Sequence, residues 1–361
     1  MNTERVYIIA EAGVNHNGNR DMAMALIDSA ADAGADAVKF QTFKADKLAT
    51  ATAPKAAYQR ERTDAMESQV AMLKKLELPK AWHQEMQDRA HGRGLEFLST
   101  PFDADSLRFL CDLGVPKLKV PSGELVNAPL LWQFARTGKP LIVSTGMATL
   151  SEVEEALAVI AHALHNSSEP ENFEAAWKCW SCPESRNALR GRVTLLHCTS
   201  SYPTPPREVN LLAMDTLAST FGLPVGYSDH TRGWTIAMAA VARGACIIEK
   251  HFTLDRNLPG PDHKASLEAD ELARMVSEIR ILEQALGDGR KAPQPTEWDS
   301  RLAARQQVVA AREIRAGQTI ERADLGTARC GGNGLPARLL WDLVGRISRH
   351  DIAPGERIPR D

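Results

Sequence analysis

The sequence lacks any long apolar run. No stretch approaches the roughly 20 consecutive apolar residues that a membrane-spanning helix requires, and Met1 to Arg5 contain no apolar core of a secretion signal. We therefore expect neither a membrane span nor export. The formal net charge of −3 gives no electrostatic basis for binding nucleic acid or an anionic membrane. An anionic ligand would have to be held by local basic groups.

The sequence also lacks the cysteine spacing of a disulfide framework or a zinc site. Its six cysteines are scattered, which in a chain of this size indicates reduced thiols and a cytoplasmic location. Cys179 and Cys182 form one CxxC, but no second CxxC or HxxxH completes a zinc site. Both lie in a stretch, residues 165–190, that we expect to be irregular. We interpret this CxxC as incidental.

What the sequence does contain is a repeated unit, in which a glycine is followed by a short apolar run that ends at polar side chains. Seven copies follow Gly34, Gly94, Gly114, Gly138, Gly191, Gly222 and Gly244, and an eighth run starts at Val6. A glycine closing a helix, then a buried strand with a reactive residue at its C-terminal end, is the unit of a (β/α)8 TIM barrel. The pattern predicts such an α/β barrel over residues 1–287, with the active site at that end of the strands.

The chain is longer than a barrel alone. Its 361 residues exceed the about 250 of a typical barrel, and a polar, proline-bearing linker is expected over residues 288–305. Residues 306–361 contain short β-like runs and a weak internal repeat, Glu313–Ile320 and Asp351–Ile358, with an acid, Ile and Gly at matching positions. Two such half-units predict a small pseudo-symmetric β-rich domain.

Two lysines lie inside apolar strands, where burial is costly unless the ammonium group meets an anion. Lys39 and Lys119 are both near the C-terminal ends of predicted strands, where Thr100, Ser122 and Ser228 supply hydroxyl groups. Together they form a candidate cradle for a phosphate and a carboxylate. The alternative is that each lysine pairs with a core glutamate such as Glu11 or Glu124.

Two histidines end neighbouring strands. His230 and His251 could converge on one divalent metal, with Asp229, Glu249 or Asp262 completing or orienting the site. These parts fit several reactions, including a Schiff-base aldolase that would use a lysine as its nucleophile. The spacing alone indicates only a barrel enzyme that acts on an anionic small molecule.

At the level of motifs the chain resembles the sialic acid synthase family, whose N-acetylneuraminate synthase-like members condense phosphoenolpyruvate with an N-acetylated hexosamine. The matching segments span nearly the whole chain: Ala10-EAGVNHNG, Ala37-VKFQT, Ser99-TPF, Lys119-VPSGE, Ser144-TGM, His197-CTSSYPTP, Gly226-YSDHT, Glu249-KHFT and Pro259-GPDHKASLE. The segments Arg312-EIRAGQTI and Val344-GRISRHDIAPGE resemble the family's antifreeze-like (SAF, β-clip) domain.

The resemblance implies a role for each candidate. It implies that His230 and His251 bind a divalent metal, Mn²⁺ first, with Mg²⁺ or Co²⁺ as alternatives, and that Glu11, Lys39 and Lys119 are catalytic. Phosphoenolpyruvate would be held by the two lysines and by Thr100, Ser122 and Ser228, with Ser200 near the phosphate. Substrate contacts would also come from Gln41, Glu124, Tyr202, Asp262 and Arg329.

The resemblance also implies a phosphoenolpyruvate-dependent transferase working as a domain-swapped homodimer, in which Arg329 reaches the partner's barrel. The first expectation for the acceptor is N-acetylmannosamine, giving N-acetylneuraminate and phosphate. The alternative is a 2,4-diacetamido-2,4,6-trideoxyhexose, giving legionaminic or pseudaminic acid. Three positions depart from the family pattern: Arg329-Cys-Gly-Gly-Asn-Gly replaces Arg-Pro-Gly-x-Gly, Arg305-Gln-Gln replaces Arg-Arg-Ser, and Ser200 stands where some members have an asparagine.

Overall fold

A computed structural model describes residues 5–64, 66–332 and 334–360 of the chain. It divides into two compact units, residues 1–288 and 289–361, which we describe separately. The outermost residues of the two expected domains, 1–4 and 361, lie outside the described residues, as do Ala65 and Asn333.

The first unit is built on eight parallel strands. In hydrogen-bonded order they run β3-β2-β1-β8-β7-β6-β5-β4, and β3 and β4, at the two ends of this order, also lie side by side. The strands therefore enclose a barrel, which confirms the predicted TIM fold. Their bounds are β1 (Tyr7–Gly13), β2 (Ala37–Thr42), β3 (Glu96–Pro101), β4 (Leu118–Val120), β5 (Leu141–Ser144), β6 (Val193–Cys198), β7 (Val225–Asp229) and β8 (Ile247–His251).

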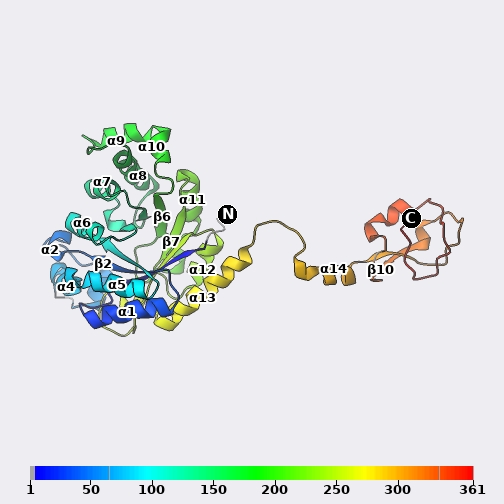
Figure 1. The fold of residues 1–361 in the computed structure, drawn as a ribbon, viewed down its shortest axis with the longest axis horizontal. Helices are drawn as coiled ribbons and strands as arrows, with labels where there is room; N and C mark the ends of the chain where they lie inside the picture. The colour runs from blue at the N-terminus through cyan, green and yellow to red at the C-terminus, as the bar shows by residue number, and fades with distance from the viewer. Residues whose placement is uncertain (1–4, 65, 333, 361) are drawn as a thin grey trace. The chain divides into compact units, whose positions relative to one another are not determined.

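Helices surround these strands (Figure 1). They are α1 (Arg20–Asp32), α2 (Ala45–Leu48), α3 (Ala57–Arg62), α4 (Gln69–Leu76), α5 (His83–Gly92), α6 (Ala104–Asp112), α7 (Ala128–Arg136), α8 (Leu150–His165), α9 (Phe173–Trp180), α10 (Pro183–Asn187), α11 (Leu212–Phe221), α12 (Thr235–Ala242) and α13 (Ala269–Leu286). Within the described ranges, none is both long and apolar enough to cross a membrane.

The glycines of the repeat lie where helices give way to strands. All seven have a left-handed backbone, with φ between +63° and +97°, a conformation that side chains with a Cβ rarely adopt. The glycine therefore ends each helix and turns the chain into the next strand. This backbone requirement explains why the repeat could be recognised in the sequence.

Side-chain alternation along the strands separates a barrel interior from an outer core. One cluster gathers alternate residues of six strands: Ile9, Ala37, Leu98, Ile142, Leu196 and Ile247. Two residues further along, on the same face of each strand, come polar or sulfur-bearing side chains: Glu11, Lys39, Thr100, Ser144, Cys198 and Glu249. An apolar layer thus closes the barrel beneath its polar C-terminal end. The residues between them face the surrounding helices in a larger core.

The stretch expected to be irregular, residues 165–190, instead carries two short helices. Helices α9 and α10 pack on α8 and are seen together in Figure 1. Asn172 caps α9 by accepting from the Ala175 backbone N–H, and Pro183 occupies the first turn of α10. Cys179 and Cys182 are free thiols.

Among its described residues, the second unit contains one antiparallel pair of strands, β9 (Gln307–Ala310) and β10 (Leu325–Ala328), and the short helices α14 (Trp298–Ala304) and α15 (Leu340–Leu343). The internal repeat forms a pair here: Ile314 and Ile352 exchange both backbone hydrogen bonds. Ile320 and Ile358, which end the two half-units, are buried in the same core. The predicted small β-rich domain is confirmed, and the two half-units of its repeat meet at this isoleucine pair. Helix α14 lies within the segment expected to be a linker.

Candidate active site

A cavity of about 490 Å³ opens at the C-terminal ends of the barrel strands. Every strand contributes at least one lining residue: Glu11, Lys39, Thr100, Lys119, Ser144, Cys198, Ser228 and Glu249. Loops that follow the strands add further candidates from the sequence, namely Ser122, Ser200, Tyr202, His230 and Asp262. The alternation of the strands thus brings side chains that are far apart in the chain to one place.

Two lysines and two glutamates form a buried cluster on the floor of this cavity. The Lys39 ammonium nitrogen lies 2.6 Å from a Glu11 carboxylate oxygen and 3.4 Å from one of Glu249. Lys119 lies 3.3 Å from the other oxygen of Glu249, and Lys39 also donates to the Thr100 hydroxyl at 3.0 Å. The pairing of each lysine with a core glutamate is therefore observed, while both lysines also reach the cavity; the anion cradle stays a prediction. The partner of Lys119 is Glu249 and not Glu124.

The two carboxyl groups of this cluster differ in the direction in which their pKa values are shifted. Burial alone would raise the pKa of Glu249, but Lys119 and Lys39 outweigh it and hold that pKa well below its ordinary value. Burial raises the pKa of Glu11 to about 7, against the pull of Lys39. Glu11 is therefore the carboxyl group that can take up or release a proton near neutral pH.

Lys39 keeps its charge although it is buried. Burial alone would lower its pKa, but Glu11 and Glu249 raise that pKa above the ordinary lysine value. A Schiff-base lysine needs a neutral amine, which proteins obtain by lowering the pKa. The surroundings of Lys39 thus suit an anion-binding ammonium group rather than a nucleophile.

The two histidines predicted as metal ligands lie side by side at the C-terminal ends of β7 and β8. Their ring centroids are 5.5 Å apart, and the Tyr202 ring packs against both, at 4.2 Å from His230 and 5.6 Å from His251. Burial lowers the pKa of His230 to about 4 and, together with the nearby His230 and Lys39, lowers that of His251 well below its ordinary value. Both shifts favour the neutral imidazole, which is the form that binds metals.

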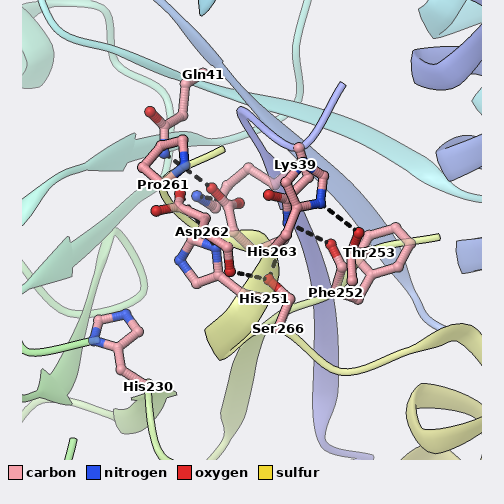
Figure 2. A network of polar contacts seen from close by, with 12 residues as sticks. Lys39, Gln41, His230, His251, Phe252, Thr253, Pro261, Asp262, His263 and Ser266 are labelled. Carbon is pink, nitrogen blue, oxygen red and sulfur yellow. Dashed lines mark hydrogen bonds and ion pairs between the residues drawn. The ribbon is translucent and has the colours of Figure 1, made fainter. Parts of the chain in front are cut away.

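The hydrogen bonds of these rings fit a role as ligands. His230 Nδ1 donates to the Thr199 carbonyl oxygen at 2.7 Å, which leaves the lone pair on Nε2. His251 Nδ1 is buried with no hydrogen-bond partner, and an Asp262 carboxylate oxygen lies 3.9 Å away. Figure 2 shows Asp262 beside the His251 ring. No group of three or more His, Cys, Asp or Glu that could hold a metal occurs among the described residues, so the remaining ligands would be water or substrate oxygens.

One predicted site residue of the barrel does not line the cavity, and another belongs to the second unit. Glu124 does not line the cavity; one of its carboxylate oxygens accepts from Asn127 at 2.7 Å. Arg329 belongs to the second unit, where it follows β10 and is exposed. Gln41 does line the cavity and donates to Glu11 at 3.5 Å.

Two features of the cavity were not predicted from the sequence, namely the pairing of Glu249 with the lysines and an apolar lining. Glu249 was identified only as a possible neighbour of a metal, yet it joins both lysines. In addition, an apolar wall of seven side chains lines the cavity: Val14, Phe43, Leu48, Met72, Leu73, Leu76 and Phe102. The helical spacing of Met72 and Leu76 could have indicated a buried face on α4, but not what that face covers.

The fold and this cavity define the class of protein, a barrel enzyme with two buried lysines at the C-terminal ends of its strands. The sequence model of the NeuB family matches residues 26–291 of this chain, and that of the SAF domain matches residues 305–361. The chain therefore belongs to the NeuB family. The enzyme class predicted from the sequence, a phosphoenolpyruvate-dependent synthase of the sialic acid type, is confirmed.

Individual relatives match along almost the whole chain. N,N'-diacetyllegionaminic acid synthases of Campylobacter jejuni and Legionella pneumophila are each 44% identical, covering 98% and 97% of this chain and 99% and 92% of their own. N-acetylneuraminate-9-phosphate synthase of Homo sapiens is 32% identical over 94% of this chain and 88% of its own. The crystal structure of an N-acetylneuraminic acid synthetase from Leptospira borgpetersenii, in complex with citrate, is 35% identical, with a TM-score of 0.68 over 83% of this chain and 91% of that one.

Proposed function

We propose that this enzyme condenses phosphoenolpyruvate with a 2,4-diacetamido-2,4,6-trideoxyhexose, forming a nine-carbon 2-keto acid of the legionaminic type and releasing phosphate. The choice of acceptor is supported by the relatives named for diacetyllegionaminic acid, at 44% identity against 32% for the human neuraminate-9-phosphate synthase. The first expectation, N-acetylmannosamine, is therefore the weaker reading. The condensation itself is shared by both.

The observation that carries the chemistry is the pair of buried lysines facing one cavity. Phosphoenolpyruvate brings a carboxylate and a phosphate, and Lys39 and Lys119 supply two ammonium groups within a site already rich in hydroxyl donors. Binding the substrate would replace carboxylate contacts of these lysines with contacts to the ligand. Thr100, Ser122, Ser200 and Ser228 line the same cavity and can donate to the phosphate.

The reaction forms one carbon–carbon bond and breaks one carbon–oxygen bond. C3 of phosphoenolpyruvate attacks the aldehyde carbon of the open-chain sugar, the aldehyde oxygen takes a proton, water adds at C2, and phosphate leaves from C2. We propose that Glu11 handles one of these protons, because its pKa of about 7 lets it exchange protons near neutral pH. Gln41, Tyr202 and Asp262 would contact the sugar.

We propose a divalent metal, with Mn²⁺ as the first candidate, held by His230 and His251. When bound, it would supply Lewis-acid polarisation of the aldehyde oxygen. The neutral rings and the unpartnered His251 Nδ1 support this assignment. The swapped homodimer, with Arg329 supplied by the partner, and the cytoplasmic location remain predictions from the sequence.

The experiment that tests this function is phosphate release from phosphoenolpyruvate with a set of acceptor sugars. We expect release with the diacetamido-trideoxyhexose, at a kcat/KM above that for N-acetylmannosamine. Release only with N-acetylmannosamine would reject the proposed acceptor, and release with neither sugar would reject the function. A Schiff-base aldolase would instead be trapped by borohydride in the presence of pyruvate.

A further inference from the structure

The apolar wall is a separate hydrophobic cluster of the barrel unit, and each of its members faces the cavity. Four of its side chains, Val14, Phe43, Met72 and Leu76, are buried, and Leu48, Leu73 and Phe102 pack against them. All seven line the same cavity as the lysine–glutamate cluster. Binding of anionic and hydroxylated groups alone would not require seven apolar side chains in the lining of the site.

The wall lies on one side of the cavity because of where its segments enter. Val14 follows β1, Phe43 follows β2, Phe102 follows β3, and the remaining members come from α2 and α4, which lie between β2 and β3. The opposite side, after β4 to β8, carries the polar side chains Ser122, Ser200, Tyr202, His230 and His251. The apolar wall is thus confined to the segments that follow β1, β2 and β3, above the charged side chains that Glu11 and Lys39 contribute from the strands themselves.

Amide side chains lie beside the wall. Gln59 of α3 and Gln69 of α4 line the cavity, and both are half-buried. An acetamido group presents an N–H and a C=O next to a methyl group, so amides beside an apolar surface match its two ends. A 6-deoxy sugar adds a further methyl group at C6, which has no hydrogen bond to satisfy.

We propose that this wall receives the apolar substituents of the acceptor sugar, the C6 methyl group above all, and so makes the enzyme select 6-deoxy over 6-hydroxy acceptors. The proposal rests on the proposed function. A hydroxyl at C6 would lie against Met72, Leu73 and Leu76 with no polar partner from the wall, and would lose its water. Specificity then comes from rejection of the extra hydroxyl as well as from contact with the methyl group.

The test compares two acceptors that differ only at C6: the 2,4-diacetamido-2,4,6-trideoxyhexose and the same sugar with a 6-hydroxyl. For the unaltered enzyme we expect kcat/KM to be about 10- to 100-fold higher with the 6-deoxy sugar, the range open to an apolar pocket. The variant Leu73→Asn places an amide in the wall at nearly constant size. It should lower kcat/KM for the 6-deoxy sugar, and with it the ratio between the two sugars, by about tenfold, with the KM for phosphoenolpyruvate unchanged.

A control variant and a replacement variant accompany Leu73→Asn in this test. Leu286→Asn makes the same substitution at a leucine that is 43% exposed on α13 and does not line the cavity, so it should leave the ratio as it is. If Leu73→Asn fails to fold, Leu48→Asn, on α2, takes its place. A ratio near one in the unaltered enzyme, or equal losses for both sugars in the wall variants, would overturn the proposal while leaving the proposed function intact. No phosphate release with either sugar would reject the proposed function and this inference together.

Discussion

Lys39 pairs with Glu11 at 2.6 Å, with the exposed fraction of both side chains at 3% or less. The two residues lie on neighbouring strands, where Glu11 is in register with Lys39. Their side chains point into the barrel because each follows an inward apolar residue, Ile9 or Ala37, by two positions. The register of β1 and β2 and the alternation of their side chains therefore place these two charged groups together in the site.

Replacing Lys39 tests how strongly the site depends on this charge. Lys39→Met leaves Glu11 and Glu249 buried without their shared cation, so it should destabilise the barrel by about 3–5 kcal/mol and reduce phosphate release at least 100-fold. The free energy of unfolding from denaturant titration and a phosphate assay measure the two effects. Lys117→Met is the control, because the pair of Lys117 with Glu96 is partly exposed and should contribute about 1 kcal/mol or less. Equal losses of stability in the two variants would contradict this account.

A second buried ion pair lies behind the metal-ligand candidates. Lys250 donates to Asp229 at 2.9 Å and to the Thr231 carbonyl oxygen at 2.6 Å, and neither charged side chain is exposed. Lys250→Met should cost about 3–5 kcal/mol, and the double variant Asp229→Asn/Lys250→Met should recover much of that loss, since it leaves no unpaired charge. A double variant as unstable as the single one would show that the contact contributes by shape rather than by charge.

Metal removal tests the histidine pair. Treatment with EDTA should abolish phosphate release, and Mn²⁺ should restore it. Calorimetric titration after metal removal should detect one Mn²⁺ bound per chain of the unsubstituted protein. It should detect none bound to His230→Ala or His251→Ala, because each substitution removes one of two protein ligands. Full activity in a metal-free sample would remove both histidines from this role.

Subunit complementation tests the predicted swap of the small domain. Glu11→Ala and Arg329→Ala should each be inactive as pure proteins, since each lacks one group of the site. Mixing them should regenerate activity, because one of the two sites in a mixed dimer would then be intact. Confirmed subunit exchange without any recovery would argue against a contribution of Arg329 in trans.

Much of the barrel could be predicted because it depends on local backbone rules. The seven glycines have left-handed backbones, and period-two alternation turns Lys39 and Lys119 inward. Partner choice could not be predicted, because Lys119 on β4 meets Glu249 on β8 across the barrel, a contact that no local pattern encodes. Glu124, close in sequence to Lys119, was the wrong partner for this reason.

The helical spacing of apolar residues predicts which face of a helix is buried, but not what that face packs against. Met72 and Leu76 predict an apolar side of α4, yet only the fold turns that side toward the cavity. Helices α9 and α10 were missed because each is eight residues or fewer, and the Pro and Ser residues around them resemble a loop. The acceptor sugar could not be predicted either, since the motifs shared by the family surround its common chemistry.

The most direct test of the central claim measures phosphate released from phosphoenolpyruvate by the purified chain with Mn²⁺ and the 2,4-diacetamido-2,4,6-trideoxyhexose, together with the mass of the product. We expect one phosphate for each nine-carbon 2-keto acid formed, and no phosphate release above background in Lys39→Met. Release of phosphate without a condensed product, or unchanged condensation in Lys39→Met, would contradict this claim.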